Sequence, residues 1–332
     1  GDYLVKLNER KEKVPRHQDL PEEAFMSFEE LQSEEVEIVA ISYCWCSKGH
    51  PDPHRYHLPL ISTMIKAIMA GKFRRGYNPP HSKGLRLGAS AVAVLWDFLC
   101  LPQEKRSASE KAIFKRGLAS MNAWYGSAQV TKWILTDLPE GAERASYQSS
   151  GWTRFELEVA NLISPPWRML TLTRGTEVSR QLLECERRGF KEKDCIEIAY
   201  KAFKAGNRTG PMLPDDFDKC LDALTFTNGT DRDSVKPKCR ETFNILVEGA
   251  SFISVRGFNM THEAAETALQ LVLAYCPNMK ELDMAENRKW EANPRRIVER
   301  LAATPCSSRL TRLDLSSNIG LSGDVSSFGE LT

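Results

Sequence analysis

The sequence lacks a long hydrophobic run. Its longest apolar stretch, from Ala89 to Leu101, is too short to cross a bilayer and contains Asp97. A secretory signal peptide is also missing from the sequence. These two absences argue against a membrane-spanning or secreted protein, so we expect no membrane association and a cytoplasmic location.

The sequence has no excess of charge of one sign. Lys and Arg number 45 and Asp and Glu number 44 among 332 residues, which leaves a net charge of +1. This balance argues against a nucleic-acid-binding or membrane-surface protein. The nine cysteines, an odd number, are closely spaced only at Cys44 and Cys46. We therefore expect reduced thiols and no disulfide framework.

Several common catalytic and metal-binding motifs are missing. The sequence has no Walker loop, no Gly-x-Gly-x-x-Gly and no His-Glu-x-x-His. A cysteine nucleophile at Cys100 or Cys44 is disfavoured because nothing fixes a histidine beside either residue. One cluster raises a zinc hypothesis, but its Cys-x-Cys spacing is unusual for structural zinc, and we predict no metal site. The cluster comprises Cys44, Cys46, His50, His54 and His57.

The first half of the chain alternates strand and helix patterns. The predicted strands cover 36–46, 91–101, 130–136 and 168–173, and the helices between them cover 58–69, 109–124 and 151–163, with a basic loop at 71–88. This alternation is typical of a parallel α/β sheet. Ligands of such sheets lie at the carboxyl ends of the strands, where Tyr43, Trp45 and Asp97 are expected.

The helix predicted over 151–163 carries a candidate catalytic carboxylate. Glu156 lies at the edge of an apolar stripe, one turn after Trp152. Partial burial raises the pKa of a carboxylate, which suits a catalytic acid or base. The same position also fits a surface glutamate whose stem packs on tryptophan. Glu158 is expected to point away from the stripe as a surface charge.

The remaining segments differ in composition and in sequence pattern. Residues 1–35 are highly charged and are expected to form a surface arm, before an α/β domain over 36–176. Residues 177–248 have mostly helical patterns and are predicted to form a connector. From 249 to 332 the sequence repeats, with short strands beginning at residues 253, 282 and 313.

Asparagines recur within these repeats. Asn287 and Asn318 occupy the same place after the second and third short strands, and amphipathic helices lie between the strands. This is the leucine-rich-repeat pattern, which predicts an α/β solenoid with a curved surface for recognition or self-association. We therefore expect a protein partner, a homo-oligomer or a larger assembly. Because the sequence stops at Thr332 within the pattern, we expect it to be part of a longer chain.

Motifs in the α/β segment resemble those of a known family. The stretch Ala40-Ile41-Ser42-Tyr43-Cys44-Trp45 is similar to the first-strand motif of heterokaryon-incompatibility (HET) domains within the TIR-like superfamily. The stretch 95–103 resembles a second HET signature, and Gly151-Trp152-Thr153 with Glu156 resembles a third. The resemblance implies a flavodoxin-like (TIR-like) parallel sheet.

The resemblance also implies a chemistry. TIR NAD hydrolases carry their catalytic glutamate at the spacing from Trp152 to Glu156, and they cleave the nicotinamide–ribose bond. NAD would then be a substrate, with no tightly bound cofactor. Glu156 would stabilise an oxocarbenium-like state or orient water. The resemblance assigns NAD contacts to Ser42, Tyr43, Trp45, Asp97 and Trp152.

Alternatives to these assignments remain open. Tyr43 and Trp45 also fit core positions on one strand face, and Asp97 also fits a cap of the following turn. Two functional classes are therefore carried forward. The first is an NAD-cleaving enzyme or immune-type sensor, and the second is a non-catalytic scaffold that uses the fold and the repeats for protein interactions.

Overall fold

The chain forms two compact units, described in a computed structural model over residues 1–71, 87–143, 146–204, 210–226, 231–258 and 260–322. The predicted basic loop 71–88 lies almost wholly outside these residues, as do residues 323–332 of the repeats. The first unit comprises Gly1–Tyr125, Gln129–Arg154 and Trp167–Gly206, and the second comprises Gly126–Ala128, Phe155–Pro166 and Asn207–Thr332.

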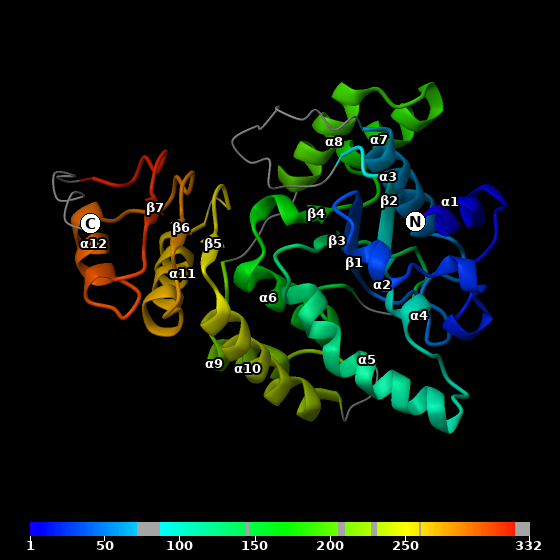
Figure 1. The fold of residues 1–332 in the computed structure, drawn as a ribbon, viewed down its shortest axis with the longest axis horizontal. Helices are drawn as coiled ribbons and strands as arrows, with labels where there is room; N and C mark the ends of the chain where they lie inside the picture. The colour runs from blue at the N-terminus through cyan, green and yellow to red at the C-terminus, as the bar shows by residue number, and fades with distance from the viewer. Residues whose placement is uncertain (72–86, 144–145, 205–209, 227–230, 259, 323–332) are drawn as a thin grey trace. The chain divides into compact units, whose positions relative to one another are not determined.

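A four-stranded parallel sheet organises the first unit (Figure 1). Its strands are β1 (Val36–Tyr43), β2 (Ala91–Leu95), β3 (Thr131–Leu135) and β4 (Met169–Thr171), in the order β2-β1-β3-β4. The chain runs outward from β1 to β2 and then returns across the sheet to β3. The direction of winding therefore reverses between β1 and β3. The predicted α/β class with a parallel sheet is confirmed.

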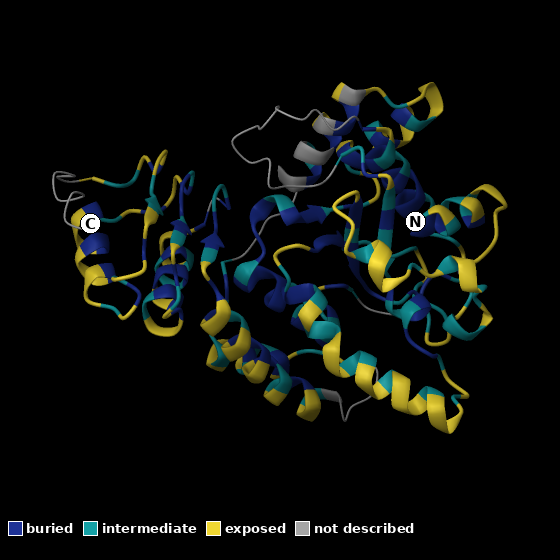
Figure 2. Ribbon diagram, in the orientation of Figure 1, coloured by how far each residue is buried: buried dark blue, intermediate teal, exposed yellow. Residues whose placement is uncertain are grey.

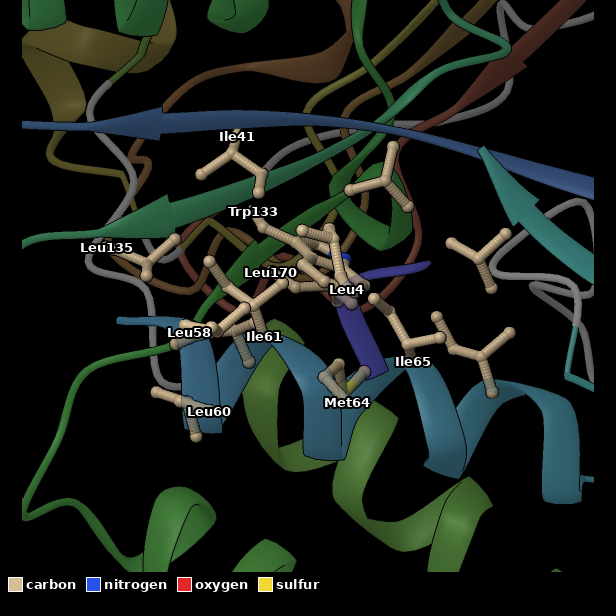
Figure 3. Close-up of a cluster of buried hydrophobic side chains, with 14 of the residues drawn as sticks. Leu4, Ile41, Leu58, Leu60, Ile61, Met64, Ile65, Trp133, Leu135 and Leu170 are labelled. Atoms are coloured by element: carbon tan, nitrogen blue, oxygen red, sulfur yellow. The ribbon is translucent and has the colours of Figure 1, made fainter. Parts of the chain in front are cut away.

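Helix α3 (Leu58–Ala70) packs on one face of this sheet. Figure 3 shows its side chains Leu58, Ile61 and Ile65 in one buried cluster with residues of β1, β3 and β4. The helix begins where the Asp52 carboxylate accepts hydrogen bonds from the backbone N–H groups of residues 56, 57 and 58. These donors have no partner within the helix, so the carboxylate stabilises its first turn.

The amino-terminal segment contributes to the same core. Helix α1 (Asp2–Glu9) packs against α3, and its Leu4 and Leu7 are buried, as is Val14. The prediction of a surface arm is therefore wrong for this part of residues 1–35. The prediction relied on the high charge of the segment. It overlooked that Leu4 and Leu7 are three residues apart, which places both on one side of a helix.

The second predicted strand ends earlier than expected. Strand β2 stops at Leu95, and Asp97–Cys100 forms a short helix, α4. The Asp97 carboxylate accepts a hydrogen bond from the backbone N–H of Phe98, while the carbonyl of Trp96 accepts from Leu99 and Cys100. A continuous apolar run does not distinguish a buried strand from a buried helical turn, and here the local hydrogen bonds decide for the helix.

The remaining helices of the first part of the chain are α2 (Phe28–Leu31), α5 (Ala108–Gly126) and α6 (Gly151–Ile163). Short 3-10 helices occur at His17–Asp19, Glu22–Ala24 and Pro166–Arg168. The segment expected as a connector is divided between the units. Helices α7 (Glu177–Arg188) and α8 (Glu192–Lys204) fall in the first, and α9 (Pro214–Asp222) and α10 (Asp231–Gly249) fall in the second.

The second unit contains a three-stranded parallel sheet, β5-β6-β7. Strands β5 (Phe252–Ser254), β6 (Glu281–Asp283) and β7 (Arg312–Asp314) alternate with helices α11 (His262–Tyr275) and α12 (Pro294–Ala302). Buried Asn287 donates to the carbonyls of Val255 and Met284, and the Asn318 carboxamide accepts from the backbone N–H of Asn287 at 2.6 Å. The two asparagines thus link successive turns of the stack.

Helix α6 is buried on more sides than its apolar stripe predicts (Figure 2). Glu158 is only 4% exposed, so the prediction that it is a surface charge is wrong. Its carboxylate lies close enough to Cys239 of α10 to contribute, after burial, to the raised pKa of that thiol. The sequence pattern identifies the apolar side of α6 but does not show that Glu158, outside that side, is buried as well.

Among the described residues, none of the helices combines the length and the apolar character needed to span a membrane.

Candidate functional site

A hydrogen-bonded cluster joins the carboxyl ends of β1 and β2. The hydroxyl of Tyr43 donates to Asp97 Oδ1 at 2.7 Å, and the indole Nε1–H of Trp45 donates to Asp97 Oδ2 at 3.1 Å. Tyr43 is the last residue of β1, and Asp97 follows β2. Because the two strands are neighbours in a parallel sheet, their ends meet at one edge. The structure therefore brings together three of the predicted site residues.

Burial and charge determine the protonation of this cluster. Tyr43 is 6% exposed, and burial together with the nearby Asp97 carboxylate raises the pKa of its hydroxyl well above the usual range. Burial also raises the pKa of Asp97, while hydrogen bonds from Tyr43 and Trp45 act in the opposite direction. Tyr43 therefore remains a proton donor at neutral pH, and Asp97 is its acceptor.

Aromatic rings pack around the two donors. The ring of Tyr43 meets Trp96 edge-on with centroids 5.6 Å apart, and the ring of Trp45 meets Phe98 in the same way at 5.6 Å. Tyr43 belongs to the buried core of the first unit, whereas Trp45 is half-buried. The core position that the sequence left open for Tyr43 is therefore confirmed, and Asp97 also accepts a hydrogen bond from the backbone N–H of Phe98 in the turn that follows β2.

Ser42 is connected to the segment that precedes α6. Its hydroxyl, fully buried, lies 2.7 Å from the hydroxyl of Tyr147. The carbonyl of Tyr147 accepts a hydrogen bond from Thr153 Oγ1 in the first turn of α6. Ser42 thus fixes the start of this helix relative to β1. The role of Tyr147 has no motif in the sequence, because it depends on a contact across 105 residues.

A second polar group lies at the carboxyl ends of β3 and β4. Asp137 accepts hydrogen bonds from the hydroxyl of Tyr56 at 2.8 Å and from the backbone N–H of Arg174 at 3.1 Å. The guanidinium of Arg174 lies 4.5 Å from the centroid of the Tyr56 ring. Burial, followed by the bond to Asp137, raises the pKa of Tyr56 to about 12. The only signal for these residues in the sequence is that Asp137 and Arg174 each follow a strand.

His50, one histidine of the zinc hypothesis, serves the local structure. Nε2 of His50 is 2.8 Å from the carbonyl of Val14, and Nδ1 accepts from the backbone N–H of Asp52 at 3.0 Å. Both ring nitrogens are therefore engaged, and burial lowers the pKa of His50, which favours the neutral ring. Across the described residues, no three His, Cys, Asp or Glu side chains are grouped so as to hold a metal ion.

Trp152 and Glu156 lie on α6, which contributes to both units. Trp152 falls in the first unit and Glu156 in the second, and both side chains are half-buried. A common site for Glu156 with Tyr43 and Trp45 involves residues of separate units and stays a prediction.

No protein-family model, no curated protein and no solved structure matches this chain. The interpretation of its function therefore depends on its own residues and geometry.

Proposed function

We propose that the chain is a TIR/HET-like protein that cleaves the nicotinamide–ribose bond of NAD and carries a leucine-rich-repeat recognition module. The strand order β2-β1-β3-β4 supports this proposal because it equals the flavodoxin-type order 2-1-3-4-5 without its last strand. Helix α6, which carries Glu156, follows β3 in the chain. Ligands of sheets with this winding bind where the order reverses, which here is between β1 and β3.

The contact between Tyr43 and Asp97 carries the proposal. These residues come from two different stretches that resemble HET signatures, separated by more than 50 positions. Their direct hydrogen bond, with Trp45 on the second carboxylate oxygen, gives both stretches a shared physical role at the ligand-binding edge of the sheet. Three matched residues that meet in one cluster are a stronger argument than three separate sequence matches.

The proposed mechanism assigns the chemistry to Glu156. Departure of nicotinamide leaves positive charge on the ribose, which a nearby carboxylate stabilises while water attacks. Trp45 and Trp152, both half-buried, are the proposed aromatic contacts to the substrate. Ser42, Tyr43 and Asp97 are bonded to protein groups. We therefore propose that these three residues hold the edge of the site in shape.

NAD turnover tests this proposal. The full chain is incubated with NAD at low and high protein concentration, and free nicotinamide is quantified by chromatography. We expect nicotinamide release that Glu156→Ala abolishes and that Glu184→Ala, an exposed glutamate on α7, leaves unchanged. Equal inactivity of the wild type and both variants, even when the protein is clustered by a crosslinked tag, would contradict the enzymatic proposal.

A non-catalytic scaffold is the second candidate function. The carboxylate of Asp97 already accepts three hydrogen bonds, from Tyr43, Trp45 and the backbone of Phe98. With three acceptor positions already used, Asp97 is suited to a structural role at the carboxyl ends of β1 and β2. The scaffold would then bind other proteins through its second unit. The three parallel strands and the asparagine contacts of that unit support a leucine-rich-repeat solenoid that binds a protein partner or a second copy.

A further inference from the structure

A cavity of about 550 Å³ lies beside the edge strand of the first unit. Its floor includes Ile38 of β1 and Ala91, Ala93 and Leu95 of β2. The alternate residue Val39 belongs to the core that contains α3, so the cavity lies on the other face of the sheet. The two alanines have short side chains, and this leaves space above β2.

The walls of the cavity are apolar and partly aromatic. Helix α5 contributes Met121 and Trp124, and the amino-terminal segment contributes Leu20, Phe25 and Met26. A volume of about 550 Å³ is within the range of roughly 300–1,000 Å³ that is usual for small-molecule sites. The size and lining therefore suit a compact organic ligand with an apolar body.

The charged side chains of the cavity are all acidic. Asp2, Glu23, Glu30 and Asp97 line it, and among the described residues that do so none is Lys, Arg or His. Glu23 and Glu30 are exposed, whereas Asp97 is half-buried. Gly1, with its α-amino group, also lines the cavity, but the carboxylates outnumber it, so the lining disfavours an anionic ligand. A cation carried on an apolar body matches it in both charge and polarity.

We propose that this cavity binds an organic cation with an apolar body, a primary amine on an aromatic or alkyl group. The Glu30 carboxylate is engaged with the backbone N–H of Ser27 in a capping box, so the proposal takes Glu23 in place of Glu30 as the acceptor for the ammonium. Phe25 and Trp124 are the aromatic lining residues, and aromatic rings attract both a cation and an aromatic body. The cavity shares Asp97 with the cluster at the carboxyl ends of β1 and β2, but the proposed contacts to the amine involve no residue assigned to NAD.

Isothermal titration of the full chain with three matched probes tests the proposal. The probes are 4-phenylbutylamine, 4-phenylbutan-1-ol and 4-phenylbutyrate, which share one body and differ in charge. We expect the amine to bind about tenfold more tightly than the alcohol, because a hydrogen bond to a charged group is stronger than one between neutral groups. The carboxylate should bind weakest of the three.

Variants locate the binding. Glu23→Gln should weaken the amine about tenfold and leave the alcohol unchanged, since it removes only the charge. Glu22→Gln, at the exposed neighbour that does not line the cavity, should bind like the wild type. Ala93→Phe should abolish binding of both probes by filling the floor. If that variant unfolds by circular dichroism, Glu23→Lys replaces it and should abolish binding of the amine alone.

Two results would overturn the inference. Equal affinity for the amine and the alcohol would show that charge is not recognised. Amine binding that is unaffected by Glu23→Gln and by the cavity variant would place the ligand elsewhere on the chain.

Discussion

The Tyr43 hydroxyl and the Asp97 carboxylate are 2.7 Å apart and join the ends of two adjacent strands. Both groups are removed from water to a large extent, and burial acts on the pKa of each in the same direction. The bond therefore compensates for their desolvation. It also determines where Trp45 lies, because the second oxygen of the same carboxylate accepts from the indole.

Tyr43→Phe should destabilise the first unit by about 2 kcal/mol, because it leaves a buried carboxylate with one donor fewer. Asp97→Asn should cost a similar amount, since its amide nitrogen would face a donor. The double variant should cost less than the sum of the two, by at least about 0.5 kcal/mol. The stability of the first unit is measured by hydrogen exchange of the β1 and β2 amides. A single melting temperature is less suitable, because a chain with two units need not unfold in one step. Additive effects would contradict the direct coupling.

The stability contributed by Asp97 should depend on pH. Because burial raises its folded pKa above 3.8, the folded state prefers the protonated form, and the contribution of Asp97 is greatest below pH 3.8. This contribution is lost as the pH rises through the raised pKa. The stability difference between the wild type and Asp97→Asn should therefore be larger at pH 3.5 than at pH 7. A difference that grows with pH would instead mean that hydrogen bonds to the charged form outweigh burial.

The parallel sheet and the repeat asparagines could be predicted because local patterns specify them. The β-branched run 36–43 and the recurrence of Asn287 and Asn318 both correspond to structural elements. The contacts that shape the candidate site are different in kind. Those of Ser42 with Tyr147 and of Tyr56 with Asp137 join residues 105 and 81 positions apart, and no periodicity encodes such pairs.

Two further predictions, for Glu158 and for Asp97–Cys100, were wrong because local sequence patterns do not report tertiary contacts. Helical periodicity correctly placed residues 151–163 on a helix, but it did not show that Glu158 is buried, near enough to Cys239 of α10 to raise the pKa of that thiol. The apolar run after β2 contains no residue that forbids a strand. In the structure it forms a short helix, in which the Trp96 carbonyl and the Asp97 carboxylate accept hydrogen bonds from the backbone.

Arg256 connects all three strands of the second sheet. Its guanidinium pairs with Asp283 at 2.8 Å, with Glu286 at 3.1 Å and with Asp314. Arg256→Gln should destabilise this unit by about 2–3 kcal/mol, because it leaves three partly buried carboxylates facing one another. Hydrogen exchange over 252–316 should report the loss.

The control for Arg256 is an exposed arginine of the same unit. Arg295 pairs with Glu299 on the surface of α12, and Arg295→Gln should cost no more than about 0.5 kcal/mol. An equal cost for both variants would indicate that the Arg256 network contributes no more than a surface pair.

Thiol reactivity should separate two cysteines of similar exposure. Cys100 and Cys220 are both half-buried, but burial raises the pKa of Cys100 to about 11. At pH 8 only on the order of one Cys100 side chain in a thousand is then a thiolate, which is the reactive form. Iodoacetamide should therefore modify Cys220 well before Cys100, as followed by peptide mass spectrometry. Cys46 and Cys276, with pKa values raised to about 12 and buried side chains, should react more slowly than Cys100.

The pH dependence of the same reaction provides its own check. The rate at Cys100 should rise about tenfold between pH 7.5 and pH 8.5, because its thiolate fraction grows in proportion to hydroxide below pH 11. A rate at Cys100 that levels off in this range would show that its thiol ionises near neutral pH. Such a result would reopen the nucleophilic role that the sequence disfavours, since a thiolate at neutral pH requires a cationic partner beside Cys100.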